Sequence, residues 1–205
     1  MPIVKTELEW PYRPADFFEA PYHWQTDDYT LGANAGTVLV TLATPSDPID
    51  AELQTQITKK VEGLFFARQL LVHRTFELES VRVCQRRSDG GKERSLSFTA
   101  KLSLTAAFDY LSVSEQPNVI IHNASGTVLQ DSKSKRITEH TKFIDSIISK
   151  LSSSETLDAL LESYNAAVSD PAKELAHLYD IRDALIKHYG KADEARRRLG
   201  ISVED

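Results

Sequence analysis

The residues of this chain best suited to chemistry are Arg182 and His188, in the segment LYDIRDALIKHYG. A histidine can transfer a proton, and an arginine can stabilise the negative charge that develops on a phosphate. Held together, the two residue types could act on a phosphodiester. A similar spacing recurs at Arg68 and His73, where a predicted helix gives way to a strand. We interpret that second match as a coincidence.

A regular helix does not bring Arg182 and His188 together. An offset of six residues separates the two side chains by about 120° or more. We therefore predict no catalytic residues, and we keep Arg182 and His188 as the catalytic pair of an alternative hypothesis. Arg182 instead lies in the middle of an apolar stripe on the same helix. The stripe consists of Leu175, Leu178, Tyr179, Leu185, Ile186 and Tyr189.

A guanidinium within an apolar stripe needs a partner, because burying it unpaired costs several kcal/mol. We expect packed helices to enclose Arg182 and a carboxylate to pair with it. The candidate partners on the preceding helices are Asp145, Asp158 and Glu162. A structural ion pair is the preferred interpretation, and an opening that binds an anion is the alternative.

Basic residues gather in groups that could contact the phosphates of a nucleic acid. One group flanks the turn Asp89-Gly90-Gly91, a second begins the helical part and a third lies in the last helix. The candidate nucleic-acid-binding residues are Arg86, Arg87, Lys92, Arg94, Lys191, Arg196, Arg197 and Arg198. No aromatic residues are interleaved with them to stack on bases, so a solvated surface is the preferred interpretation.

The first part of the chain has the pattern of strands with one helix. Two β-rich runs surround Asn34-Ala35-Gly36, which predicts a hairpin. Asp47-Pro48 predicts the start of a helix, and apolar residues at helical spacing continue it to about Phe66. Thr75–Val83 and the alternating residues 96–104 predict two further strands joined by a turn. These elements predict an antiparallel sheet with one packed helix.

The N-terminal part is also rich in aromatic residues. They are Trp10, Tyr12, Phe17, Phe18, Tyr22, Trp24 and Tyr29. Together with Pro11, Pro14 and Pro21 they suggest an extended arm that packs over the sheet, which is our preferred interpretation. The alternative is that they line a groove for a small molecule or a partner.

The later part of the chain has the pattern of helices. Apolar residues from Ile137 to Leu151 step by three and four. Ser152 and Glu155 form a predicted capping box for the next helix, and Asp170-Pro171 predicts the start of the last long one.

Gly190 and Gly200 predict the ends of the last two helices. We therefore predict an α+β protein with a sheet domain at 1–116, a junction at 117–132 and a small C-terminal helical bundle at 133–205.

Composition limits the class of protein. Hydrophobic residues make up 41% and charged residues 26%, which is typical of a folded domain. The net charge of -6 argues against bulk attraction to nucleic acid or to an anionic membrane. No apolar run approaches the ~20 residues that cross a bilayer, and the start of the chain lacks the pattern of a signal peptide. We expect a cytoplasmic protein with no membrane contact, cofactor or metal ion.

The end of the chain resembles a known family. The segment LYDIRDALIKHYGKADEARRRLGIS is similar to the C-terminal helical segment of uncharacterised bacterial proteins related to the ApeA-like HEPN group. The matching residues are Leu178, Tyr179, Ile181, Arg182, Ala184, Gly190, Ala195, Leu199, Gly200, Ile201 and Ser202. The segment GLFFARQLLVHRTFELES also resembles their N-terminal region, so the similarity covers about half of the chain.

The resemblance implies a HEPN-like bundle and a link to nucleic acids or to defence. In those relatives the chain continues into a basic segment with Arg and His, where ribonuclease chemistry is expected. This sequence lacks that segment, so we expect either a truncated piece or a protein without that activity.

We therefore predict a non-catalytic protein-interaction or assembly module of a bacterial nucleic-acid-related or defence-related system. Its expected partner is another protein or a second copy, with RNA as a further candidate. The alternative is a HEPN-like, metal-independent endoribonuclease whose site needs a downstream segment or a dimer partner.

Overall fold

The computed structural model describes residues 2–96, 119–122, 128–151 and 153–200. It contains two compact units. The first consists of Met1–Val61 and Phe76–Phe143, and the second of Glu62–Thr75 and Ile144–Asp205. Two long helices therefore contribute residues to both units. The predicted division into 1–116, 117–132 and 133–205 stays a prediction.

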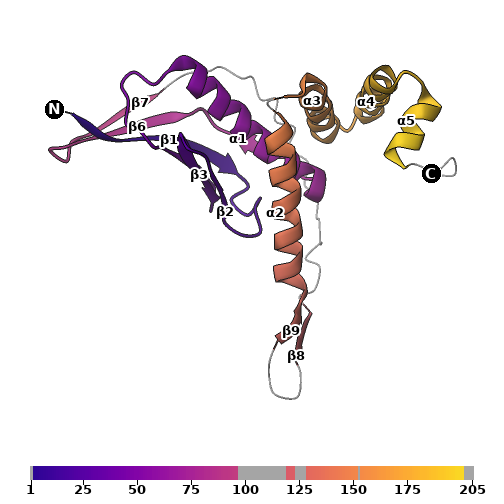
Figure 1. Ribbon diagram of the computed structural model, residues 1–205, viewed down its shortest axis with the longest axis horizontal. Coiled ribbons are helices and arrows are strands. Elements are labelled where there is room, and N and C mark those ends of the chain that lie inside the picture. Colours follow the sequence, from indigo (N-terminus) through magenta and orange to yellow (C-terminus); the bar gives the residue numbers. More distant parts are fainter. Residues whose placement is uncertain (1, 97–118, 123–127, 152, 201–205) are drawn as a thin grey trace. The chain divides into compact units, whose positions relative to one another are not determined.

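The first unit is built on an antiparallel sheet with the strand order β2-β3-β4-β1-β6-β7. Its strands are β1 (Ile3–Arg13), β2 (Tyr22–Gln25), β3 (Tyr29–Asn34), β4 (Thr37–Leu42), β6 (Arg82–Arg87) and β7 (Lys92–Leu96). The long strand β1 lies between β4 and β6, and the short strand β5 (Glu77–Leu78) pairs with its end. Figure 1 labels β1, β2, β3, β6 and β7 of this sheet. The sheet and the helices that follow it confirm the predicted α+β fold.

The predicted hairpin at Asn34-Ala35-Gly36 joins β3 to β4. Asn34 pairs with Thr37, and the two residues between them have positive φ angles of 47° and 84°. This is the backbone that a two-residue hairpin turn requires. Glycine adopts it without steric cost at position 36, where a Cβ would also crowd Ala15.

The second predicted turn joins β6 to β7. The Asp89 carboxylate accepts a hydrogen bond from the Gly91 amide at 2.9 Å, and Gly90 has a positive φ. Of the strand predicted at 96–104, Leu96 belongs to β7, and the remainder lies outside the described residues.

One face of the sheet forms the core of the first unit. Every second side chain of β1 is buried from Thr6 to Tyr12, as the period of a strand requires. Leu8 is fully buried and lies opposite Val40 on one side and Val83 on the other. These contacts bury apolar area on both sides of β1, which stabilises the sheet.

The N-terminal aromatic residues belong largely to this core. Trp10, Tyr12, Phe17, Tyr22 and Tyr29 are all buried. The ring of Phe17 packs edge-on against Phe18, with 5.5 Å between the centroids, and lies 5.4 Å from the ring of Phe76. These aromatics pack in the protein, as preferred, but the expected arm over the sheet is wrong, because most of them belong to strands β1, β2 and β3 of the sheet itself.

Helix α1 (Ala51–Val72) starts later and runs further than predicted. The Asp50 carboxylate accepts a hydrogen bond from the Leu53 amide at 2.9 Å, so Asp50 caps the helix. The predicted start at Asp47-Pro48 is wrong because the capping oxygen lies three residues further on. The predicted end at Phe66 is also wrong, because the following residues continue the buried helical face with Ala67 and Gln69.

The second half of α1 lies close to the end of α2 (Ser132–Leu151) within the second unit. A Cβ at Gly63 would collide with the Leu151 side chain, so glycine permits the close approach of the two helices. Ile144, Ile148 and Leu151 are buried at the predicted three- and four-residue steps.

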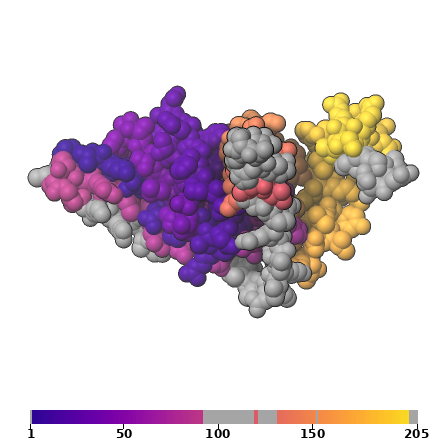
Figure 2. Space-filling view, turned by 90° about the horizontal axis from the view of Figure 1, so that it is seen from below, coloured from indigo at the N-terminus to yellow at the C-terminus, as the bar shows by residue number. Residues whose placement is uncertain are grey.

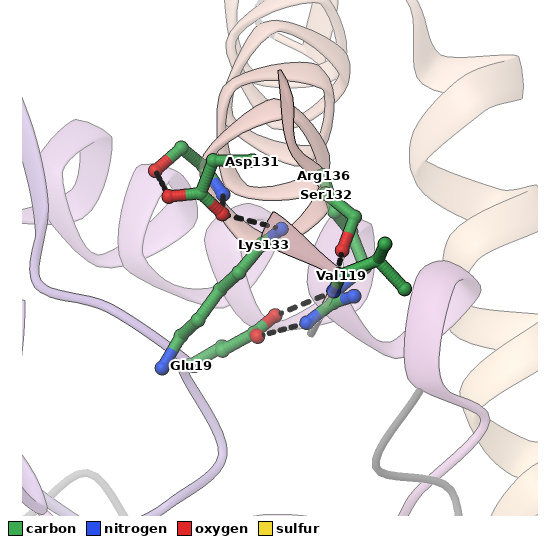
Figure 3. Close-up of polar contacts among 7 residues, drawn as sticks. Glu19, Val119, Asp131, Ser132, Lys133 and Arg136 are labelled. Carbon is green, nitrogen blue, oxygen red and sulfur yellow. Dashed lines mark hydrogen bonds and ion pairs between the residues drawn. The ribbon is translucent and has the colours of Figure 1, made fainter. Parts of the chain in front are cut away.

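Helix α2 begins directly after a small hairpin of β8 (Ile120–His122) and β9 (Val128–Asp131). The Asp131 carboxylate accepts hydrogen bonds from the amides of Lys133 and Ser134 and from the Ser134 hydroxyl (Figure 3). These bonds lower the pKa of Asp131, the Ser134 hydroxyl having the largest effect.

Arg136, one turn into α2, makes two hydrogen bonds to Glu19 in the segment after β1 (Figure 3). A guanidinium and a carboxylate in this fork geometry form a directional pair. Arg136 therefore holds the start of α2 to the N-terminal segment of the first unit.

The second unit contains α3 (Glu155–Ser169), α4 (Glu174–Tyr189) and α5 (Ala192–Leu199). Ser154 caps α3 by accepting a hydrogen bond from the Leu157 amide, so the predicted cap at Ser152 is wrong by two residues. No helix in the described ranges has both the length and the apolar character needed to span a membrane.

Asp170 ends α3 rather than starting α4, which corrects the prediction at Asp170-Pro171. Its amide donates to the carbonyl of Ala166, and α4 begins only at Glu174. The predicted helix ends at Gly190 and Gly200 are confirmed, and both glycines have positive φ angles.

Candidate functional site

The candidate site is the face of α4 that points away from its neighbouring helices. α4 packs against both α3 and α5, yet none of its residues is buried. The partly covered side chains on the packed side are Glu174, His177, Ile181, Ala184 and Leu185. By helical periodicity these residues share one side of α4, and the apolar stripe predicted from the sequence overlaps it at Leu185 and extends beyond it to the exposed residues Leu175 and Tyr179.

The outer face of α4 exposes large apolar side chains. Leu175 is 72% exposed, Tyr179 55% and Leu178 40%. Ile186 and Tyr189 are half-buried at the other end of the same face. Figure 2 shows atoms of α4 and α5, drawn from orange to yellow, at the molecular surface. Adjacent exposed apolar residues of this size are typical of an interaction surface.

Arg182 lies in the centre of this face, and its environment differs from the prediction. Its side chain is 59% exposed and pairs with the neighbouring Asp183 at 2.8 Å. The guanidinium also lies over the ring of Tyr179, 4.7 Å from the centroid. The expectation that packed helices enclose Arg182 is wrong, because the half-buried residues of α4 centre about 100° around the helix from it.

The predicted carboxylate partners Asp145, Asp158 and Glu162 are likewise replaced by Asp183. Asp183 could not be selected from periodicity, since adjacent helical residues point in directions about 100° apart.

His188 does not join Arg182 in the structure. The His188 ring packs edge-on against Tyr189, with 4.8 Å between the centroids. Arg182 is held by Asp183 and Tyr179. The described geometry therefore does not assemble the arginine–histidine pair of the catalytic alternative.

The basic residues of α5 are partly neutralised within their own helix. Arg197 and Arg198 both pair with Glu194, which lies one turn earlier. These contacts lower the pKa of Glu194, with the hydrogen bond from Arg198 as the largest cause. Lys191 precedes the first residue of α5, and Arg196 lies in its last turn.

The other predicted basic group lies on the β6–β7 hairpin of the first unit. The Arg86 guanidinium is 3.7 Å from the carboxylate of Glu7 on β1, and Lys5 pairs with the same carboxylate at 2.6 Å. Arg87 ends β6, while Lys92 and Arg94 lie on β7. Part of this group therefore balances a carboxylate of the sheet, and nucleic-acid binding by these residues stays a prediction.

A polar contact that the sequence did not predict lies at the end of α1. His73, which has a positive φ of 49°, lies with Nδ1 2.8 Å from the hydroxyl of Tyr164 on α3. Burial, and then the charge of Glu174, raise the pKa of Tyr164. Gln69, whose carbonyl accepts a hydrogen bond from the His73 amide, is fully buried, and its side-chain amide donates to the carbonyl of Arg74.

This contact ties the end of α1 to α3 within the second unit. The spacing of Arg68 and His73 drew attention to the correct histidine, but not to Tyr164, which is 91 residues away in sequence. A hydrogen bond of that range requires the tertiary fold to be known.

The described residues therefore offer two features. One is the exposed apolar face of α4, with Arg182 paired at its centre, and the other is the hydrogen bond between His73 and Tyr164 at the end of α1. The first can bind another protein surface by burying apolar area. Comparison of the chain with protein-family models, with curated proteins and with solved structures gives no match.

Proposed function

We propose that this protein is a non-catalytic interaction or assembly module that binds a protein partner through the outer face of α4. The observation that carries the proposal is the exposure of Leu175, Leu178 and Tyr179 side by side on a helix that is otherwise well formed. A helix needs an apolar stripe to pack against something. Here the stripe and the packed side of the same helix point in different directions.

The composition of this face suits a binding site. Burying one leucine or tyrosine side chain fully contributes about 1.5–3 kcal/mol, so a few such residues can hold a partner. Tyrosine and arginine are also enriched among the residues that dominate binding energy at protein interfaces. Tyr179 and Arg182 already stack on each other, so little side-chain freedom remains to be lost on binding.

The charge on the face argues for binding rather than catalysis. The Arg182 guanidinium is engaged by Asp183 and by the Tyr179 ring, whereas a phosphate-stabilising arginine must be free to meet its substrate.

The test is affinity capture from cells that produce the chain. The bait is the wild-type protein, the double variant Leu175→Asp/Tyr179→Asp, or the control Lys187→Ala, which changes an exposed residue of α4 outside the stripe. We expect a protein partner that the wild type and the control retain and the double variant loses.

A second measurement covers the catalytic alternative. Purified protein is incubated with labelled RNA in EDTA, together with the variants Arg182→Ala and His188→Ala. We expect no cleavage. Metal-independent cleavage that disappears in both variants would contradict the proposal.

A further inference from the structure

The apolar stripe on α4 is symmetric about Arg182. Leu178 and Tyr179, both exposed, precede Arg182 by four and three residues, and Leu185 and Ile186, both half-buried, follow it by three and four. Leu185 borders the packed side of α4, so it belongs to the edge of this stripe. Leu175 and Tyr189 complete the pattern at seven residues to either side. Steps of three and four that continue over two heptads are the pattern by which one helix packs along another.

We propose that the occupant of this face is the α4 helix of a second copy of this chain, running antiparallel about a two-fold axis at Arg182. The proposal rests on the proposed function and names the partner. A two-fold interface uses the same patch on both copies, so the patch must be complementary to itself. Antiparallel pairing about position 182 meets this requirement, because Leu175 then faces Tyr189 and Leu178 faces Ile186 of the other copy.

The charges at the centre are self-complementary as well. Arg182 and Asp183 form a neutral pair on one copy, at 2.8 Å. Two copies related by the two-fold axis bring two guanidiniums and two carboxylates together, so that each Arg182 can also reach Asp183 of the other copy. Antiparallel helices further oppose their dipoles, which is favourable.

The size of the face sets the expected strength. α4 has 16 residues, which corresponds to a length of about 24 Å. A single helix pair of this length buries less than the roughly 1,600 Å² of a standard interface. A reversible dimer with a Kd of about 1–100 μM is therefore expected.

The first experiment is sedimentation equilibrium of the purified full chain from about 1 to 500 μM, a range that brackets the expected Kd. We expect a monomer–dimer equilibrium in the wild type and in the control Lys187→Glu, which changes a charge on α4 outside the stripe. Arg182→Glu should raise the Kd about tenfold or more, because four carboxylates then meet at the centre. Circular dichroism checks that each variant is folded.

The decisive experiment mixes two variants. Arg182→Glu gathers four acidic groups at the axis, and Asp183→Arg gathers four basic groups, so each variant alone should dimerise about tenfold or more weakly than the wild type. Their equimolar mixture should form a heterodimer with close to the wild-type Kd, because the two carboxylates of one variant then meet the two guanidiniums of the other. A mixture that stays monomeric, or an Arg182→Glu variant that dimerises like the wild type, overturns the proposal.

The two proposals fail differently. A wild-type chain that stays monomeric throughout the concentration range, yet captures a different protein only when Leu175 and Tyr179 are intact, overturns the second copy and leaves the interaction function standing. A monomer whose capture is insensitive to those residues overturns both.

Discussion

The inner face of β1 and the outer face of α4 both carry apolar residues at the regular period of their secondary structure, but they meet different surroundings. Leu8 of β1 lies between Val40 and Val83 and is completely buried. Leu175 of α4 keeps 72% of its surface exposed. The periodic pattern therefore shows which side of an element is apolar, and the neighbours of that element decide whether the apolar side is used for folding.

The two regions differ in how much of their apolar surface neighbouring elements cover. A central strand has neighbours on both edges, and the residues of its inner face contribute to the core by burial. α4 packs against α3 and α5, but none of its residues is buried, and its stripe residues Leu175, Leu178 and Tyr179 stay exposed. This exposure lets a surface evolve for binding with little effect on stability.

The largest expected effect compares the same substitution in the two regions. Leu8→Ala should lower the free energy of unfolding by about 2–5 kcal/mol, because it leaves a cavity between β4 and β6. Leu175→Ala should change it by about 0.5 kcal/mol or less, because the side chain is mostly in water. Urea denaturation at low protein concentration, followed by circular dichroism, measures both. Equal losses of stability would show that α4 buries its stripe within the monomer.

Local chemistry made much of the fold predictable. The hairpin at Ala35-Gly36, the turn at Gly90 and the helix ends at Gly190 and Gly200 all depend on residues that accept a positive φ. The alternation of β1 was not singled out, although its buried residues follow the same period. Helix starts were less accurate, because several oxygen-bearing residues precede each helix and only the fold selects the one whose side chain reaches the amide.

The candidate site was only half predictable. The stripe around Arg182 could be derived from the period of a helix, and so could the presence of a charge within it. The side of α4 that meets α3 could not be predicted from the sequence, because it depends on contacts between distant residues. The same limit explains why Asp183 was missed as the partner of Arg182, and why the bond from His73 to Tyr164 could not be anticipated.

A smaller effect on the free energy of unfolding distinguishes a helix with a side-chain cap from a helix without one. α3 has a side-chain cap at Ser154, whereas Lys173 before α4 makes no capping hydrogen bond. Ser154→Ala should therefore lower the free energy of unfolding by about 1 kcal/mol, since the Leu157 amide loses its acceptor. The control Lys173→Ala removes only an exposed ion pair with Asp170 and should have an effect below about 0.5 kcal/mol. Thermal denaturation of the two variants checks this order, which an equal or reversed effect would contradict.

The smallest expected effect is a pH dependence of stability, which the Asp131 carboxylate gives to the start of α2 and which the start of α4 lacks. Hydrogen bonds from Ser134 and Lys133 lower the pKa of Asp131 in the folded protein below its ordinary value. A lowered folded pKa means that the contribution to stability is fully present above the unfolded pKa of about 3.9 and is lost as the pH falls through the folded pKa. The destabilisation caused by Asp131→Ala should thus be largest near pH 7 and should vanish below the folded pKa.

Amide chemical shifts of Lys133 and Ser134, followed by NMR from pH 7 to pH 2, report the same event. They should move together with a midpoint below the ordinary value for aspartate, and Asp131→Asn should abolish the step. The amide of Glu174 provides the comparison, because α4 has no side-chain cap to lose. If Lys133 and Ser134 showed no step of their own, the carboxylate would not be holding the start of α2. The difference between a helix anchored by its own side chains and one held by its packed side would then need another origin.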